Sequence, residues 1–565
     1  MSQASLPIFD TIEVVNLENY TVEDVMKLDK DVFKAIDLFN SNKFDQAITM
    51  LAAKADNDAI HAIAVGFLLF MRAISTFNKE DIEKAMTALE LAISVADSQN
   101  SRKPGLLKRF STLFTNDEMH WISARSFTIT CEANLLSSFL FIFEESVTGL
   151  IKAGLYLTKG IRGVEEVYQW YTKIPEEELS TTIDEDTKGA LLFVMGAVNI
   201  AKALLPPKVM KLISIFGYSV DMDMGFQLMH QCEQTNSIYS KIAPLFLLGI
   251  FSILLSFAPG TQSIEQYTLM QTRLDSCLKD YPDCVFYLIL ASRFKRSQRD
   301  LKSSIKLLEK SITVQEEWLG LLNLGKFELT MTLFYSLDFQ AVFDLVDSLQ
   351  KETFWSKAFF SYCKGACKDM LGEDGFNFYL ESIQFVTRKF SGRSIAIEQF
   401  VTKRVQYYQS LSPITINNKT FSVNDQRKLL LPGLEICFLF MGFSFMGVKE
   451  LEQSLVLVNA SIQTSKVLNI PHFLNHLNLL KCGLTRNLNI IKKTYDLSQL
   501  IDLESIQGDA MDWLEPFSVF EQGQLHLDAY LVTKNKVYLT RAKELLVKAM
   551  NYSGYVLEFR YYVFI

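Results

Sequence analysis

The sequence has little of the residues that break helices, bind metals or form disulfides. Its 565 residues include only 12 prolines, 25 glycines and six histidines. So few prolines and glycines are untypical of an all-β protein with many turns. The eight cysteines are scattered through apolar stretches, whereas disulfide-rich secreted proteins concentrate them in short chains. We therefore expect a reduced cytoplasmic protein, with the nucleus or an organelle surface as further locations.

The chain also lacks an excess of positive charge. Lys and Arg number 56, Asp and Glu number 64, and the net charge is −8. An acidic chain does not attract the phosphate backbone, so we expect no nucleic-acid partner. Hydrophobic residues make up 49% and aromatic residues 12%, which supplies a large core and excludes general disorder. A chain of this length forms about four domains or one long repeat array.

One long uncharged segment could be either a membrane span or a helix of a soluble core. Residues 242–264 carry no charge, and residues 242–258 are strongly apolar. A membrane span needs about 20 apolar residues, but Pro244 and Pro259 leave only about 14 positions between them. We therefore favour a buried core helix over integral membrane insertion.

Apolar residues recur at helical spacing along most of the chain. Residues 31–54 and 67–92 each read as two helices joined by a short polar turn. Small residues alternate with large ones where such helices would approach, which is typical of the tetratricopeptide unit. The repeat positions are Phe438, Met441, Gly442 and Phe445 in one first helix, Phe359, Tyr362, Cys363 and Ala366 in another, and Ser454, Val458, Ser461, Ala341, Leu345, Ser348, Ala542, Leu546 and Ala549 in second helices.

The pattern predicts an all-α fold, an α-solenoid of tetratricopeptide-like hairpins with some helices enclosed; the alternative is a generic helical bundle. We divide it into residues 1–172, 173–264, 265–409 and 410–565. The acidic stretch 173–188 reads as a solvated loop, with a docking site for a basic partner as the alternative. Residues 410–428 are polar and read as a linker.

Motifs for chemistry are weak. Residues 320–326 match the glycine and lysine spacing of a phosphate loop, but Phe327 replaces the required hydroxyl and the intervening residues suit a helix. His472 and His476, followed by Cys482, could begin a zinc site. A catalytic zinc site would also need a further ligand and a general base, which the pattern does not supply, so we interpret the two histidines as structural. Cys363 and Cys367 read as buried thiols. We predict no catalytic, cofactor-binding or metal-binding residues, and no enzyme activity, although an enzyme with a pocket hidden from sequence is a further hypothesis.

A repeat array offers a concave groove that binds protein or peptide partners. On the repeat spacing, Arg72 and Lys364 would face this groove and meet a carboxylate, unless they are ordinary solvated charges. The alternative function is peripheral membrane or lipid-droplet association through the apolar central helices, either residues 242–258 or an amphipathic helix at 208–216.

Several segments, in order along the chain, resemble one family. They are residues 39–44, 66–73, 81–85, 118–120, 204–207, 216–217, 355–358, 391–394, 516–517 and 557–560. The sequence resembles the tetratricopeptide repeat protein 39 family, to which the fungal inclusion body clearance proteins are related. The resemblance implies a non-catalytic scaffold or adaptor linked to protein turnover and lipid homeostasis.

Overall fold

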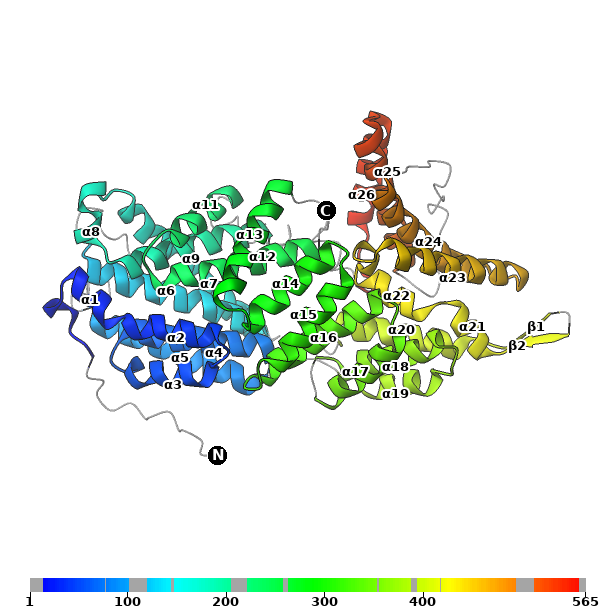
Figure 1. Ribbon diagram of the computed structural model, residues 1–565, viewed down its shortest axis with the longest axis horizontal. Helices are drawn as coiled ribbons and strands as arrows, with labels where there is room; N and C mark the ends of the chain where they lie inside the picture. Colours follow the sequence, from blue (N-terminus) through cyan, green and yellow to red (C-terminus); the bar gives the residue numbers. More distant parts are fainter. Residues whose placement is uncertain are drawn as a thin grey trace. The chain divides into compact units, whose positions relative to one another are not determined.

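The computed structural model describes residues 14–76, 78–100, 119–143, 147–204, 221–257, 263–352, 355–387, 394–416, 418–493 and 513–557. In these ranges the chain is almost entirely α-helical, with a few 3-10 turns and a two-stranded hairpin (Figure 1). The all-α prediction is confirmed. The predicted amphipathic helix at 208–216 lies outside the described residues.

The chain forms two compact units. The first contains residues up to 250, 272–287 and 314–321, and the second contains residues 251–271, 288–313 and 322 onward. Residues of both units occur in α12 (Ala243–Phe257), α13 (Ile264–Asp280), α14 (Val285–Ser297) and α16 (Leu319–Tyr335). The division into four segments stays a prediction.

The first unit is a series of helical hairpins. Its further elements are η1 (Leu17–Asn19), α1 (Val22–Leu28), α2 (Lys30–Asn40), α3 (Phe44–Ala55), α4 (Ala59–Thr76), α5 (Lys79–Gln99), α6 (Trp121–Phe143), α7 (Val147–Tyr171), η2 (Glu176–Glu178), α8 (Leu179–Thr182), α9 (Glu185–Leu204), α11 (Met222–Glu233) and η3 (Ile238–Lys241). Helices α2 and α3, α4 and α5, α6 and α7, and α9 and α11 pack as pairs. The first helices also pack on one another, α2 on α4 and α4 on α6, as in a tetratricopeptide stack.

Small residues stand where these helices approach. A Cβ atom on Gly66 of α4 would lie only 2.8 Å from Cδ2 of Leu89 on α5, so a larger residue would displace that side chain. The turn between α2 and α3 places Asn42 in the left-handed region, with φ 61°, which Asn tolerates better than most residues. Both hairpins that the sequence predicted at residues 31–54 and 67–92 are confirmed.

The turn of the first hairpin also meets distant segments of the same unit. The Asn42 amide donates to the carbonyl oxygen of Asp283 at 2.6 Å, and its side-chain oxygen accepts from the Val285 amide at 3.0 Å. Next to this turn, the rings of Phe44 and Trp318 stack with their centroids 4.1 Å apart. Asp283, Val285 and Trp318, which all belong to the first unit, therefore pack back onto the turn between α2 and α3.

The second unit contains a further series of helices. These are α15 (Leu301–Thr313), α17 (Phe339–Lys351), α18 (Lys357–Met370), α19 (Phe376–Gln384), α20 (Ala396–Ser410), α21 (Val423–Leu429), α22 (Pro432–Leu439), η4 (Gly442–Ser444), α23 (Val448–Val467), α24 (Pro471–Lys492), α25 (Leu514–Thr533) and α26 (Lys536–Asn551). A large hydrophobic core runs through it from α15 to α26.

Within its described residues, 410–416 and 418–428, the predicted linker instead contains two strands and most of a short helix. Strands β1 (Ile414–Ile416) and β2 (Lys419–Phe421) pair antiparallel, with Thr415 opposite Thr420, and project beyond α21 in Figure 1. Ser422 then caps α21 through a reciprocal hydrogen-bonded pair with Asp425. The polar composition of this segment reflects a short exposed hairpin and a helix cap, not a flexible connection.

The predicted helical face from Phe438 to Phe445 is wrong. Helix α22 ends at Leu439, Met441 has φ 59°, and Gly442 begins the 3-10 turn η4. Gly442 nevertheless lies in a tight contact, because a Cβ atom there would stand 2.4 Å from the ring of Tyr335. A tight turn against an aromatic ring, not a helix crossing, explains the small residue.

The other repeat positions fall on helices with varied burial. Ser454, Val458 and Ser461 are buried on α23. Ala341, Leu345 and Ser348 are only half-buried, because the core face of α17 lies one residue later, at Val342, Val346 and Leu349. On α26 the buried residues are Ala542, Leu545 and Ala549, with Leu546 half-buried beside them. The four residues predicted on α18, Phe359, Tyr362, Cys363 and Ala366, are all buried.

Candidate functional site

The first helices of the hairpins in the first unit enclose a cavity of about 40 Å³. Apolar side chains from α2, α3 and α4 form most of its wall, and Glu132 of α6, η3 and the segment from Ile242 into α12 form the rest. Its lining residues are Val32, Ala35, Ile36, Phe39, Asn40, Leu51, Ile63, Ala64, Phe67, Leu68, Glu132, Ile238, Tyr239, Lys241, Ile242 and Leu245. This is the face on which an open tetratricopeptide array binds a peptide.

In this protein the chain itself occupies that face. Ile238 and Tyr239 of η3 are buried, as are Ala243, Leu247 and Leu248 of α12. The segment is also held by polar contacts, since Lys241 donates to Asp37 of α2 at 2.8 Å. Asp37 accepts a second hydrogen bond, at 2.6 Å, from the hydroxyl of Tyr281. The cavity is what remains of the groove after η3 and α12 have filled it.

A buried acid lines the cavity. The hydroxyl of Tyr239 donates to Glu132 of α6 at 2.5 Å. Burial raises the pKa of Glu132 to about 7, although the hydrogen bond from Tyr239 acts in the opposite direction. The pair satisfies both groups inside an apolar wall, which is a structural arrangement.

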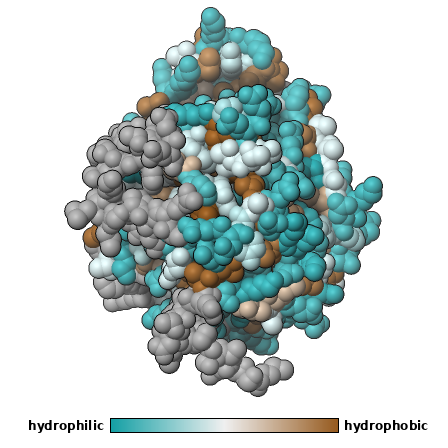
Figure 2. Space-filling model, turned by 90° about the vertical axis from the view of Figure 1, so that its left-hand side faces the viewer, coloured by the Kyte–Doolittle hydropathy of each residue, from teal (hydrophilic) through white to brown (hydrophobic). Residues whose placement is uncertain are grey.

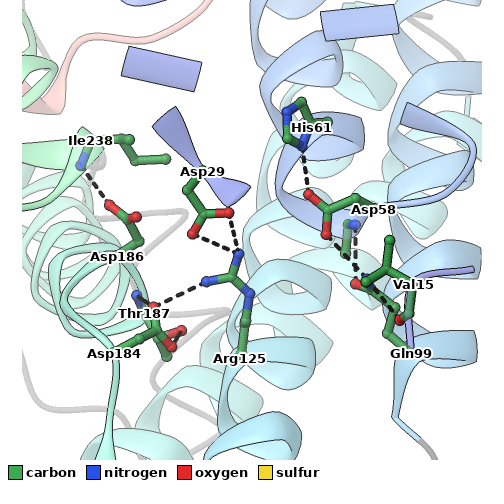
Figure 3. A network of polar contacts seen from close by, with 11 residues as sticks. Val15, Asp29, Asp58, His61, Gln99, Arg125, Asp184, Asp186, Thr187 and Ile238 are labelled. Carbon is green, nitrogen blue, oxygen red and sulfur yellow. Dashed lines mark hydrogen bonds and ion pairs between the residues drawn. The ribbon is translucent and has the colours of Figure 1, made fainter. Parts of the chain in front are cut away.

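A network of buried ion pairs lies in the same unit (Figure 3). The Arg125 guanidinium on α6 donates to both carboxylate oxygens of Asp29, each at 2.9 Å, and to Asp184 at 3.0 Å. Arg125 is 2% exposed. Burial raises the pKa of Asp29, while Arg125 opposes the rise. The carboxylates Asp29 and Asp184 in turn raise the pKa of Arg125 against the effect of burial.

This network connects the first hairpin to the segment that fills the groove. Asp184 caps α9 by accepting from the amide of Thr187 at 2.8 Å. Two residues on, Asp186 accepts from the amide of Ile238, the first residue of η3, at 2.7 Å. A chain of contacts therefore runs from Asp29 through Arg125 to the start of α9 and on to η3 (Figure 3).

A second cluster in Figure 3 fixes the N-terminal segment. Nδ1 of His61 lies 2.5 Å from a carboxylate oxygen of Asp58. The Gln99 amide donates to the other carboxylate oxygen of Asp58 at 3.1 Å and to the carbonyl oxygen of Val15 at 3.4 Å. Against the opposing effect of burial, the hydrogen bond with His61 lowers the pKa of Asp58. The cluster holds residue 15 against α4 and α5.

The prediction of a solvated acidic loop at 173–188 is therefore wrong for its second half. Glu176, Glu177 and Glu178 are exposed in η2, but Asp184 and Asp186 are fully buried. Two signals in the sequence point to the buried half. Asp184 and Thr187 have the spacing of a helix cap, and Arg125 is the lone cation in an otherwise apolar stretch of α6.

The two predicted groove cations are already paired. Nε of Arg72 lies 3.1 Å from a carboxylate oxygen of Asp81 on the neighbouring helix α5. Lys364 is 8% exposed and donates to Asp347 at 2.8 Å, with the rings of Phe343 and Phe378 near its ammonium group. Binding of a partner carboxylate by either residue stays a prediction.

The weak motifs have structural explanations. Residues 320–326 lie within α16, as the sequence indicated. His476 is fully buried and hydrogen-bonds through Nε2 to the carbonyl oxygen of Leu430 at 3.0 Å, and burial lowers its pKa to about 3. The side chain of His472 lies outside the described residues. Cys363 and Cys367 are buried, and burial raises the pKa of both thiols.

The second unit also buries charge inside its core. Arg404 of α20 donates to Glu435 of α22 at 3.0 Å, and the hydroxyl of Tyr362 on α18 donates to the same carboxylate at 3.4 Å. Helices α20, α21 and α22 pack against α18 and cover the face that carries Tyr362. The inner face of α18 is thus occupied by later helices of the same unit.

Two helices within the described ranges are long and apolar enough to cross a membrane. The windows are Ala59–Thr76, 56% buried, and Ile238–Leu255, 44% buried. Core helices of soluble proteins satisfy the same criteria. The described residues contain no group of three His, Cys, Asp or Glu side chains placed to hold a metal ion.

Comparison with known proteins decides the family. The family model named Iml2/Tetratricopeptide repeat protein 39 matches residues 33–488. This protein belongs to the Iml2/tetratricopeptide repeat protein 39 family. A chain of the crystal structure of the APC/C hetero-tetramer Cut9–Hcn1 also matches, with 9% identity over 95% of this chain and 100% of that chain, at a TM-score of 0.23. The family match supports a helical-repeat scaffold for protein interactions.

Proposed function

We propose that this protein is a non-catalytic cytoplasmic adaptor that brings other proteins together in protein turnover or lipid homeostasis. The family match over residues 33–488 is the observation that carries the proposal. Stacked hairpins present rigid extended surfaces to other proteins. The buried ionisable groups support a structural role, because Arg125 is paired with Asp29 and Asp184, and Arg404 with Glu435.

The same contacts favour partner binding on outer surfaces of the units. In the first unit η3 and α12 fill the face lined by α2, α4 and α6. In the second unit α20 and α22 cover the inner face of α18. A peptide could enter either face only by displacing helices that are part of the core. In the view of Figure 2, hydrophilic residues cover most of the coloured surface and hydrophobic ones show between them in small areas.

Proximity labelling of the full chain in its native cells, followed by mass spectrometry, tests the proposal. We expect enrichment of ubiquitin-pathway or lipid-metabolism proteins over a free-tag control. The half-lives of the recovered proteins should change when this chain is deleted and return when it is restored. Unchanged half-lives and unchanged lipid composition, together with no enrichment, would contradict the adaptor role.

The alternative is peripheral membrane association through the apolar central helices. The observation that supports it is the apolar window Ile238–Leu255, in which Lys241 is the one charged residue. Burial of Leu247 and Leu248 commits the first part of this helix to the core of the first unit, which favours the adaptor. Carbonate extraction tests the stronger form of this alternative, since a bait that resists extraction would place α12 inside a bilayer.

A further inference from the structure

Five large apolar side chains project from the hairpin of α6 and α7. They are Phe139, Ile142, Leu150, Ile151 and Leu155, with exposed fractions of 47%, 48%, 59%, 60% and 58%. None of them lines the cavity of the first unit. Exposed apolar residues scattered singly are ordinary, but a group of them on one hairpin marks an interaction surface. We call these five residues the hairpin patch.

The antiparallel register of α6 and α7 brings the members of the patch to similar positions along the two helix axes. A Cβ atom on Gly160 of α7 would meet Leu135 of α6, and one on Gly163 would meet Cys131. The ring centroids of Phe141 and Tyr156 are 5.0 Å apart. In this antiparallel register residue 139 is level with residues 155–158, and residue 142 with residues 152–155. The patch therefore spans only about two helical turns.

Positive charge borders the patch. Residues 147–164 contain Lys152, Lys159 and Arg162 and no acidic residue; Glu165, which pairs with Lys202, and Glu166 follow further along α7. The ammonium group of Lys152 lies 5.1 Å from the ring centroid of Phe141, and that of Lys159 lies 5.5 Å from that of Tyr156. Within the described part of the chain, neither lysine has a carboxylate partner. Glu144 and Glu145, between the two helices, lie outside the described residues.

We propose that the hairpin patch docks the protein on an anionic phospholipid bilayer. Projecting apolar side chains bordered by lysines are the features by which a helix surface binds a membrane interface. Peptide recognition instead uses grooves and pockets, and these side chains stand out from the helix surfaces. Acyl chains receive such side chains without a preformed pocket, and lipid phosphates attract the free lysines. The docking gives the adaptor a location and does not depend on which proteins it brings together.

Co-sedimentation of the full-length protein with lipid vesicles tests this docking. We expect binding to vesicles of phosphatidylcholine with phosphatidylserine, and weaker binding to phosphatidylcholine alone and at high salt. Leu150→Ser with Ile151→Ser should weaken binding by about tenfold or more, because two side chains no longer enter the apolar layer. Lys152→Gln with Lys159→Gln should weaken binding to the anionic vesicles by about fivefold per lysine. Circular dichroism should be unchanged in both variants, because the substituted side chains face solvent.

The turn between α25 and α26 offers a matched control. Leu531 and Val532 are both 54% exposed and adjoin Lys534 and Lys536. Leu531→Ser with Val532→Ser should leave vesicle binding unchanged. The proposal is overturned if the wild-type protein stays in the supernatant, if both vesicle types bind equally, or if only the control variant loses binding. A wild-type protein that ignores anionic vesicles but is crosslinked in cells through Lys152 to another protein would assign the patch to a protein partner.

Discussion

Removal of the Arg125 guanidinium is the most direct test of the network that joins the first hairpin to η3. Arg125→Ala would leave Asp29 and Asp184 inside the protein without their cation. Both carboxylates are almost fully buried, at 0% exposure each, and they face Arg125 at 2.9 and 3.0 Å. Loss of one partner of a buried ion pair costs about 3–5 kcal/mol, because the remaining charge is not solvated.

The size of this loss can be compared with the stability of a whole domain. The free energy of unfolding of a domain is about 5–15 kcal/mol. Arg125→Ala would therefore remove a large part of the stability of the first unit. The exposed pair of Lys84 and Glu80 in the same unit provides a control. Lys84→Ala should cost less than about 1 kcal/mol, because water already solvates both groups. Arg125→Met combined with Asp29→Asn and Asp184→Asn should recover most of the loss, since no charge then remains unpaired.

Urea unfolding and hydrogen exchange would measure these effects together. In Arg125→Ala we expect faster exchange in peptides that cover η3 and the start of α9. The loss should also shrink as the pH falls. Burial raises the pKa of Asp29 above its ordinary 3.8. The cost of leaving this carboxylate without Arg125 is therefore present at pH values above the raised pKa, and it disappears at lower pH as the carboxyl group takes up a proton. A loss below about 1 kcal/mol, or one equal at all pH values, would refute this account of the network.

Four further predictions concern two glycines, a buried acid and a buried thiol. Gly442→Leu should destabilise the protein by roughly 1–3 kcal/mol or more, because its side chain would collide with Tyr335. Gly154→Ala should stabilise it by about 0.5–1 kcal/mol, since no neighbour lies within 4 Å of the new Cβ atom; melting temperatures check both. Glu132→Gln should stabilise the protein most above pH 7, by about 3 kcal/mol, and this gain should vanish as the pH falls towards 4.5, because the raised pKa of about 7 disfavours the charged carboxylate only at higher pH. An equal gain in urea unfolding at all pH values would contradict this. Cys363 should resist iodoacetamide until the protein is unfolded, because burial raises the pKa of its thiol; rapid labelling of the folded protein would contradict its burial.

The sequence was sufficient to predict the hairpins but not every register. The apolar spacing around Phe39 and Phe44, with a polar turn between them, is local information, and both helices formed where it indicated. The face from Phe438 to Phe445 has the same spacing, yet the helix ends after Leu439. The sequence alone did not reveal that the ring of Tyr335 would pack against Gly442, a contact across more than 100 positions. Small residues therefore marked close contacts correctly without showing whether a helix or a turn makes them.

Buried charges were the least predictable part of the site. A run with six acidic residues normally faces solvent, and Glu176, Glu177 and Glu178 do so. Asp184 and Asp186 are buried because Arg125, about 60 residues earlier, and the backbone of Ile238, about 50 residues later, supply their partners. The cap spacing of Asp184 was visible locally, but its ion pair depends on how three hairpins stack.

The filled inner faces change where this scaffold is expected to act. An open array binds its ligand on the first helices, so cations placed there, such as Arg72 and Lys364, were natural candidates. In this chain Asp81 and Asp347 already pair with them, and Glu132 lies beneath Tyr239 of the segment that fills the groove. We therefore expect partners to bind on surfaces other than those that stabilise the units. Substitutions on the inner faces should act mainly through unfolding, whereas substitutions in the hairpin patch should alter binding while the fold stays intact.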